Sequence, residues 1–137
     1  MNRIALTKPD GRMVFLYADE PLRIDGDAPS PVTTPHVPNA HLRWHPLRGE
    51  WVAYAGHRQN GTFLPPPEYN PLAVSSGNEH PTELPAGEWD VAVFENLLPT
   101  LTMKAHDPPV LSVPTQPALG VCEVVVFTQD AKSRLGT

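Results

Sequence analysis

Cysteine, cationic clusters and long apolar runs are all scarce in this sequence. Cys122 is the only cysteine among 137 residues, so the chain can form no internal disulfide and has no Cys-x-x-Cys metal knuckle. The net charge is −5 and no lysine/arginine cluster occurs, which disfavours nucleic acid because duplex affinity needs many cationic phosphate contacts. The N-terminal segment lacks a signal peptide's apolar core, and no apolar stretch could span a bilayer. We therefore expect a soluble cytoplasmic protein without membrane or nucleic-acid partners.

Proline, in contrast, is abundant, with 18 residues spread along the chain. Each interior proline removes a helix hydrogen bond and adds a steric clash, so long helices are disfavoured. Residues 20–40 alone contain five prolines and are expected to form a connector. The composition predicts short strands, many turns and long ordered loops.

Two hairpins are indicated by apolar runs that flank turn residues. Residues 3–7 and 12–18 lie on either side of Pro9-Asp10-Gly11, which predicts an opening β-hairpin. The aromatic and β-branched runs of residues 41–45 and 50–55 surround a Pro/Gly turn and predict a second hairpin.

The second half of the sequence contains two further predicted strands. Residues 90–94 form a short run typical of a buried strand, and residues 121–128 are apolar on both faces except at Glu123. A strand of the latter kind is expected at the centre of a sheet, covered on both sides. Asp130 is a potential N-cap, so the last residues are expected to begin a helix.

Common cofactor motifs are missing. The sequence has no Gly-rich dinucleotide fingerprint, no Walker-type phosphate loop, no His-Glu-x-x-His and no Gly-x-Ser-x-Gly. His41 and His45 are four residues apart, but in a strand this spacing separates them by ~13 Å, too far for one ion. We interpret both as ordinary strand or turn histidines.

Four blocks of sequence resemble a known family. Residues 43–58 read Arg-Trp-His-Pro-Leu-Arg-Gly-Glu-Trp-Val-Ala-Tyr-Ala-Gly-His-Arg, similar to the opening of galactose-1-phosphate uridylyltransferases, with His45 in place of the usual Asn. Three more blocks follow in family order and extend the resemblance over about residues 10–131: Tyr69-Asn70-Pro71-Leu72-Ala73, Trp89 to Leu101 and Gly120 to Asp130.

The resemblance implies a fold and a reaction. The implied fold is α+β, a histidine-triad-like half-domain dominated by antiparallel strands with long proline-rich loops, in a homodimeric enzyme. The family transfers a uridylyl group from UDP-glucose to galactose 1-phosphate and releases glucose 1-phosphate. It does so in two steps through a uridylyl-histidine, which divides one difficult step into two easier ones. The nucleophile is the second histidine of a His-Pro-His motif.

Four residues match positions that contact the UDP-sugar in the family. Arg58 matches a phosphate-contacting arginine, whose forked guanidinium suits a phosphate. Phe94 and Asn96 match a segment that lines the uridine pocket, and Asn offers both a donor and an acceptor. Leu72 matches an apolar residue beside the base. Each residue also has an interpretation without a ligand. Arg58 would be a solvated surface arginine and Asn96 would form a turn. Phe94 and Leu72 would pack in the core.

The sequence also departs from the family. The first three zinc-ligand positions are Asn70, Ala73 and Ala131, which offer neither thiolate nor imidazole, so we expect no structural zinc and no other cofactor. The family usually has a second arginine three residues after the first, and that position is Gly61 here. The loss of this arginine weakens the expected binding of the phosphate. No His-Pro-His occurs, so the catalytic nucleophile is not in this chain. We expect residues 1–137 to be one N-terminal domain, truncated before that motif.

Three interpretations stay open. The chain is the N-terminal half of a uridylyltransferase that works with a C-terminal half or a second subunit, with UDP-glucose and galactose 1-phosphate as ligands. Alternatively, it is a catalytically inactive uridine-nucleotide-binding remnant. In the third interpretation it is an interaction module that pairs through an exposed sheet edge.

Overall fold

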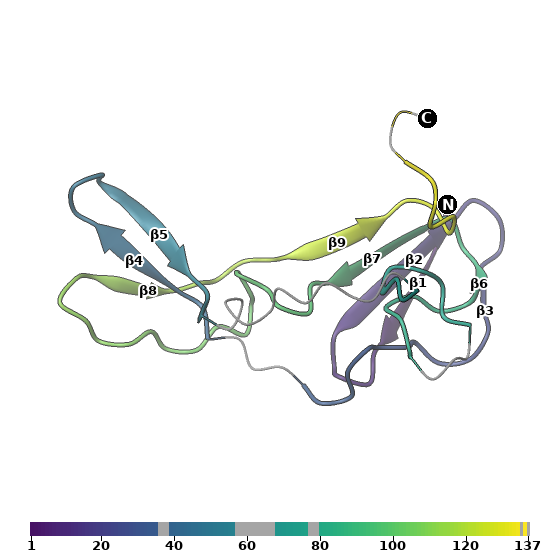
Figure 1. The fold of residues 1–137 in the computed structure, drawn as a ribbon, viewed down its shortest axis with the longest axis horizontal. Coiled ribbons are helices and arrows are strands. Elements are labelled where there is room, and N and C mark those ends of the chain that lie inside the picture. The colour runs from purple at the N-terminus through teal and green to yellow at the C-terminus, as the bar shows by residue number, and fades with distance from the viewer. Residues whose placement is uncertain (36–38, 57–67, 77–79, 135, 137) are drawn as a thin grey trace. The chain divides into compact units, whose positions relative to one another are not determined.

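The computed structural model describes residues 1–35, 39–56, 68–76, 80–134 and 136 (Figure 1). The chain divides into two compact units. Unit 1 consists of Met1–Pro35, Leu64–Glu95 and Val124–Thr137, and unit 2 consists of His36–Phe63 and Asn96–Glu123. The expectation of a single domain over residues 1–137 stays a prediction.

The predicted opening hairpin is present in unit 1. Strand β1 (Asn2–Thr7) pairs antiparallel with β2 (Met13–Ala18), from Asn2↔Ala18 to Thr7↔Met13. The turn closes with a hydrogen bond from Gly11 N to Lys8 O, and Gly11 has a φ of +85°, a conformation that glycine adopts without strain. The Pro-Asp-Gly signal therefore gave the correct turn.

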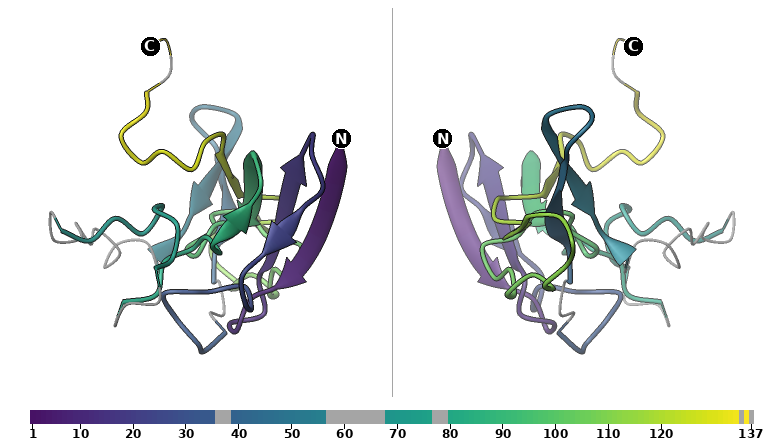
Figure 2. Two further views of the ribbon diagram at one scale, coloured as in Figure 1. Left: turned by 90° about the vertical axis from the view of Figure 1, so that its right-hand side faces the viewer. Right: turned by 90° about the vertical axis from the view of Figure 1, so that its left-hand side faces the viewer.

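The main sheet of unit 1 has the order β1-β2-β7-β9 (Figures 1 and 2). Strand β7 (Val91–Glu95) is the strand predicted at residues 90–94, and it pairs antiparallel with β2 from Tyr17↔Val91 to Val14↔Phe94. Alternate residues of both strands are buried, as expected where one sheet face covers a core. The core consists of buried apolar side chains from these strands and the loops over them: Val14, Leu16, Ala28, Leu84, Trp89, Ala92 and Phe94.

Strand β9 (Glu123–Val126) corrects one expectation. The apolar run at residues 121–128 was expected at a sheet centre, yet β9 is the last strand in the sheet order. Val124 and Val126 pack on the core, whereas Val125 is 58 % exposed and Phe127 is 48 % exposed. An apolar pattern on both faces does not determine how many neighbours a strand has, and here the second face is uncovered by the described residues.

A small second sheet completes unit 1. Strands β3 (Arg23–Ile24) and β6 (Gly87–Glu88) pair antiparallel. Gly87 has a φ of +148°, and a Cβ atom there would lie 2.2 Å from the carbonyl oxygen of Arg23. Only glycine allows the two backbones to approach this closely.

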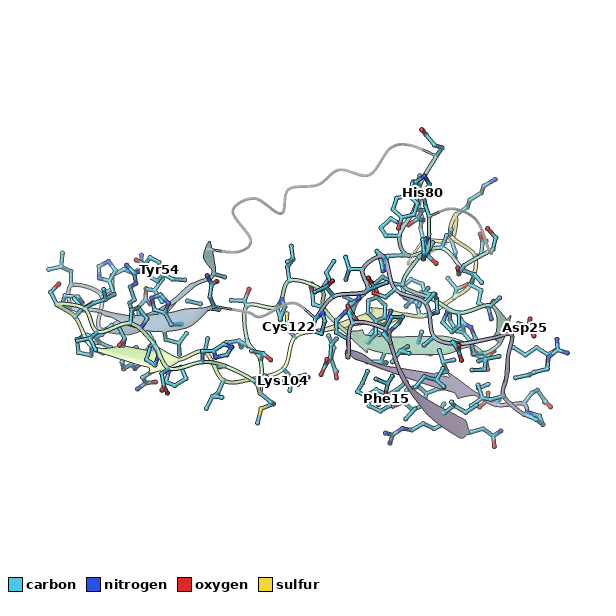
Figure 3. The ribbon with its side chains drawn as sticks, turned by 90° about the horizontal axis from the view of Figure 1, so that it is seen from below. Phe15, Asp25, Tyr54, His80, Lys104 and Cys122 are labelled. Carbon is cyan, nitrogen blue, oxygen red and sulfur yellow. The ribbon has the colours of Figure 1, made fainter. Side chains whose placement is uncertain are left out.

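Unit 2 contains the second predicted hairpin. Strands β4 (His41–His45) and β5 (Glu50–Tyr54) pair antiparallel, and β8 (Thr115–Pro117) pairs with the other edge of β4. Trp44 and Trp51 are opposite each other and their rings meet edge to face, with centroids 5.5 Å apart. Figure 3 shows Tyr54 at the end of β5. Such cross-strand aromatic pairs stabilise antiparallel strands.

The helical part of the α+β expectation is not observed in the described residues. They contain strands and turns but no α-helix. Asp130 caps a single turn, in which Lys132 N donates to Asp130 Oδ1 and Ser133 N donates to Asp130 O. The residues that follow, 131–134, are all exposed and present no apolar face, and a short helix without packing is marginal. The fold is therefore sheet-rich, and the histidine-triad-like arrangement stays a prediction.

Candidate functional site

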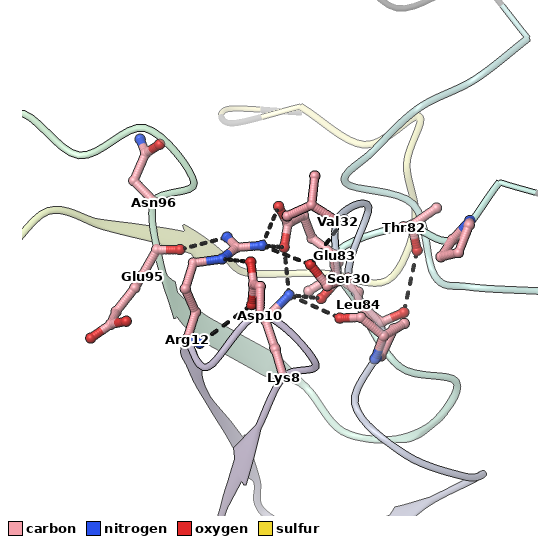
Figure 4. Close-up of polar contacts among 12 residues, drawn as sticks. Lys8, Asp10, Arg12, Ser30, Val32, Thr82, Glu83, Leu84, Glu95 and Asn96 are labelled. Carbon is pink, nitrogen blue, oxygen red and sulfur yellow. Dashed lines mark hydrogen bonds and ion pairs between the residues drawn. The ribbon is translucent and has the colours of Figure 1, made fainter. Parts of the chain in front are cut away.

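A buried group of charged side chains gathers at the β1–β2 turn, and three of its members belong to the turn itself (Figure 4). Lys8, Asp10, Arg12 and Glu83 are each at most 8 % exposed, and Ser30 is buried beside them. We refer to these five residues as the charged cluster. Two cations face two carboxylates, so the formal charges cancel. Every buried side-chain nitrogen and oxygen in the described residues has a partner, which a buried ionic group requires.

Arg12 makes contacts in several directions. Its Nε donates to Asp10 Oδ2 at 2.6 Å, and Nη2 donates to both Glu83 carboxylate oxygens at 3.0 and 2.9 Å. Nη2 also donates to Ser30 Oγ at 3.1 Å, while Nη1 donates to the backbone carbonyl of Glu95 at 2.9 Å. The guanidinium is a planar fork with five donors, and its three nitrogens are all used here.

Lys8 occupies the other side of Glu83. Its Nζ donates to Glu83 Oε2 and to the Glu83 carbonyl, both at 2.5 Å, and to the Pro29 carbonyl at 3.2 Å. The same ammonium lies 4.7 Å from the centroid of the Phe94 ring, in a cation–π contact. Burial lowers the pKa of Lys8 below its ordinary value of 10.5, although the hydrogen bond and charge of Glu83 act in the opposite direction.

Sequence reasoning missed the charged cluster. Lys8 and Arg12 flank a turn, where charged side chains are usually solvated, and Glu83 lies 75 residues after Lys8. A pairing across that distance leaves no periodic signal in one sequence. The available hint was that Arg12 adjoins β2, whose residues are nearly all apolar.

The predicted site residues fall in different parts of the structure. Phe94 is 2 % exposed in the core of unit 1, and Leu72, also in unit 1, is 43 % exposed. Asn96 begins the second segment of unit 2; its N–H donates to Cys122 O and its Oδ1 accepts from Leu98 N. Arg58 and Gly61 lie outside the described residues. The binding roles of these residues stay predictions.

The positions of the family's zinc ligands have other contacts. Asn70 Oδ1 accepts from Leu72 N at 2.9 Å, and Asn70 O accepts from Ala73 N at 3.1 Å, so Asn70 forms a local turn. Ala131 is exposed. Within the described part of the chain, no group of three or more His, Cys, Asp or Glu side chains is placed to hold a metal ion. The absence of zinc from the protein stays a prediction.

The two histidines of β4 each have a protein partner. His41 Nε2 accepts from Arg43 Nε at 2.8 Å, and its ring stacks on Tyr54 with centroids 6.0 Å apart. His45 Nδ1 accepts from Arg48 N at 3.3 Å, in the turn between β4 and β5. Separately, the described residues contain no helix that is long and apolar enough to cross a bilayer.

Comparison with known proteins gives one similarity. No family model matches the chain, and no solved structure matches it. The chain is similar to galactose-1-phosphate uridylyltransferase of Thermotoga maritima, with 36 % identity over 99 residues. The aligned segment covers 69 % of this chain and 29 % of that protein, so the chain spans less than a third of this curated relative. These findings support a partial resemblance to the galactose-1-phosphate uridylyltransferases.

Proposed function

We propose that this chain is the N-terminal part of a UDP-glucose:hexose-1-phosphate uridylyltransferase of galactose metabolism, carrying one part of the UDP-sugar pocket. The observation that carries the proposal is the 36 % identity to the Thermotoga maritima enzyme over 99 residues. The four sequence blocks, which occur in the family's order, support the same conclusion. The protein is placed in the cytoplasm and requires no zinc in this proposal.

Each matched residue has a role in the proposed pocket. Arg58 binds a phosphate of the UDP-sugar, because a guanidinium makes paired hydrogen bonds to phosphate oxygens. Asn96 binds an edge of the uracil or ribose, and Phe94 and Leu72 provide apolar surface near the base. Phosphoryl transfer depends mainly on positioning and on donors that meet the phosphate charge, so a part without the nucleophile still contributes to catalysis.

The reaction itself needs residues from outside this chain. The attacking histidine is supplied by a C-terminal half or a second subunit, since the sequence contains no His-Pro-His. In the first step this histidine bonds to the α-phosphorus of UDP-glucose and glucose 1-phosphate leaves. In the second step galactose 1-phosphate attacks the same phosphorus and releases the histidine. This chain binds and orients the nucleotide during both steps.

A titration with nucleotides tests the proposal. We expect UDP and UDP-glucose to shift the amide resonances of Arg58 and Asn96 in the 137-residue chain, with weak affinity because Gly61 removes one arginine. A dissociation constant near 1 mM corresponds to about 4 kcal/mol of binding free energy, which is reasonable for part of a pocket. Arg58→Gln should weaken binding, whereas Arg23→Gln, an exposed arginine paired with Glu88, should not.

Enzymatic assays complete the test. The chain alone should show no transfer from UDP-glucose to galactose 1-phosphate, and a folded C-terminal piece that contains His-Pro-His should restore turnover when mixed with it. Absence of turnover from two folded pieces would argue strongly against the proposal. Binding of UDP without any restored turnover would favour the inactive uridine-binding remnant instead.

The uncovered side of β9 favours a second candidate, an interaction module. Val125 in β9 is 58 % exposed, and Phe127, just after the strand, is 48 % exposed. Strand β9 ends the sheet order. Unpaired, apolar edge strands pair readily with other chains. In this alternative the chain forms oligomers whose mass, measured by light scattering, is unchanged by UDP. Val125→Lys would reduce that association.

A further inference from the structure

The charged cluster connects two of the segments that carry the predicted nucleotide contacts. Glu83 N donates to the carbonyl of Pro71 at 2.9 Å, and Pro71 immediately precedes Leu72. The carboxylate of the same Glu83 accepts two hydrogen bonds from Arg12, whose Nη1 holds the carbonyl of Glu95. One buried ion pair therefore links the end of β7 to the turn at residues 70–73, which we call the Leu72 turn.

Arg12 extends the hold on β7 beyond its backbone pairing. The register of β2 with β7 ends at Val14↔Phe94, one residue before Glu95. The Arg12 side chain binds the next residue of β7, because its guanidinium donates to the Glu95 carbonyl at 2.9 Å (Figure 4). Lys8 fixes the preceding residue, with its ammonium over the Phe94 ring. Asn96 follows directly in the chain.

The cluster is well suited to positioning. Buried ion pairs add little net stability compared with apolar packing, but their directional hydrogen bonds allow few alternative arrangements. Hydrogen bonds to Asp10, Ser30 and Glu83 hold the Arg12 guanidinium in the orientation in which it also binds Glu95. Sites that bind a ligand with precise geometry need supporting residues held in this way.

We propose that the Arg12–Glu83 pair is a positioning element for nucleotide binding, which fixes the Leu72 turn relative to Phe94 and Glu95 at the end of β7. This inference rests on the proposed function. Neither side chain touches the nucleotide in this proposal. Their effect passes through the backbone of Pro71 and Glu95.

Two conservative substitutions test the proposal in the complete 137-residue chain. Arg12→Lys keeps the positive charge but loses the fork that reaches Glu83 and Glu95 together. Glu83→Gln keeps the shape and one acceptor oxygen but removes the charge. The control is Arg23→Gln, because the Arg23–Glu88 pair is two-thirds exposed, at 66 % and 67 %, and joins β3 to β6. Each variant is studied well below its own melting temperature.

The measurements are UDP titration by calorimetry and the amide resonances of Leu72 and Glu95 without ligand. We expect Arg12→Lys to raise the UDP dissociation constant about tenfold or more, since small displacements of binding groups have large effects. Both amide resonances should move in Arg12→Lys, and Glu83→Gln should act in the same direction with a smaller effect. Arg23→Gln should leave both measurements unchanged.

The outcomes separate this inference from the proposed function. If the unmodified chain binds UDP and folded Arg12→Lys and Glu83→Gln bind it within twofold of the same constant, the positioning role is wrong and the proposed function stands. If the unmodified chain shows no UDP binding, both are overturned. If Arg12→Lys does not fold, Glu83→Gln alone decides between these outcomes by the same criterion.

Discussion

The Nζ atom of Lys8 lies 2.5 Å from a carboxylate oxygen of Glu83, and both side chains are buried although 75 residues separate them. Replacement of Lys8 by Met leaves a buried carboxylate with Arg12 as its remaining charged partner. We expect Lys8→Met to lower the free energy of unfolding by about 3 kcal/mol, as for other broken buried pairs. Urea denaturation at pH 7 measures this, with exposed Lys132→Met as the control. Equal stability of the two variants would contradict the prediction.

The lowered pKa of Lys8 predicts a specific alkaline pH dependence. Because burial lowers the pKa below 10.5, the unfolded chain holds this proton more tightly than the folded chain does. Between the folded pKa and 10.5, the unfolding free energy of the unmodified chain should therefore rise relative to Lys8→Met. Denaturation of both proteins in parallel between pH 7 and about 10.5 cancels the titration of other groups. A constant difference across that range would show that the Lys8 pKa is not lowered.

Gly87 is expected to tolerate no side chain. A Cβ atom would lie 2.2 Å from Arg23 O, and the φ of +148° is unfavourable for other residues. Gly87→Ala should separate β3 from β6 and destabilise unit 1 by about 1–3 kcal/mol, the range for strained backbone positions. Gly56→Ala is the matched control, since a Cβ atom there has nothing within 4 Å. Thermal melting followed by circular dichroism would reveal the difference, and similar melting temperatures would refute it.

Two substitutions at Asn96 separate its turn-forming role from its proposed nucleotide contact. The Oδ1 atom accepts from Leu98 N at 3.0 Å, a bond that Asn96→Asp keeps and Asn96→Ala removes. Asn96→Ala should cost about 1 kcal/mol of stability, a typical net value for one hydrogen bond. Asn96→Asp should keep the fold but weaken UDP binding, because it loses the amide donor and adds a negative charge near phosphate. Full UDP affinity in Asn96→Asp would restrict Asn96 to the turn.

The sequence predicted local structure better than long-range structure. The hairpins β1–β2 and β4–β5 were found because Pro9-Asp10-Gly11 and the Pro/Gly turn before Glu50 act on neighbouring residues. The edge position of β9 could not be inferred, since apolar faces do not specify partners. The Lys8–Glu83 pairing was equally hidden, because it joins distant segments. The phosphate-binding role of Arg58 was predicted from the family resemblance, and this residue lies outside the described residues.

The Arg12–Glu83 contact has a consequence for the order in which the chain folds. Residues of unit 2 are inserted between the segments that unit 1 needs, so the two ends of this ion pair leave the ribosome 71 residues apart. Lys8 and Arg12 of the β1–β2 hairpin must stay hydrated until the segment that contains Glu83 is synthesised. Closing so long a loop before any native contact rewards it slows folding. Unit 1 is therefore expected to assemble late in translation, after the entire β4–β5 hairpin has emerged.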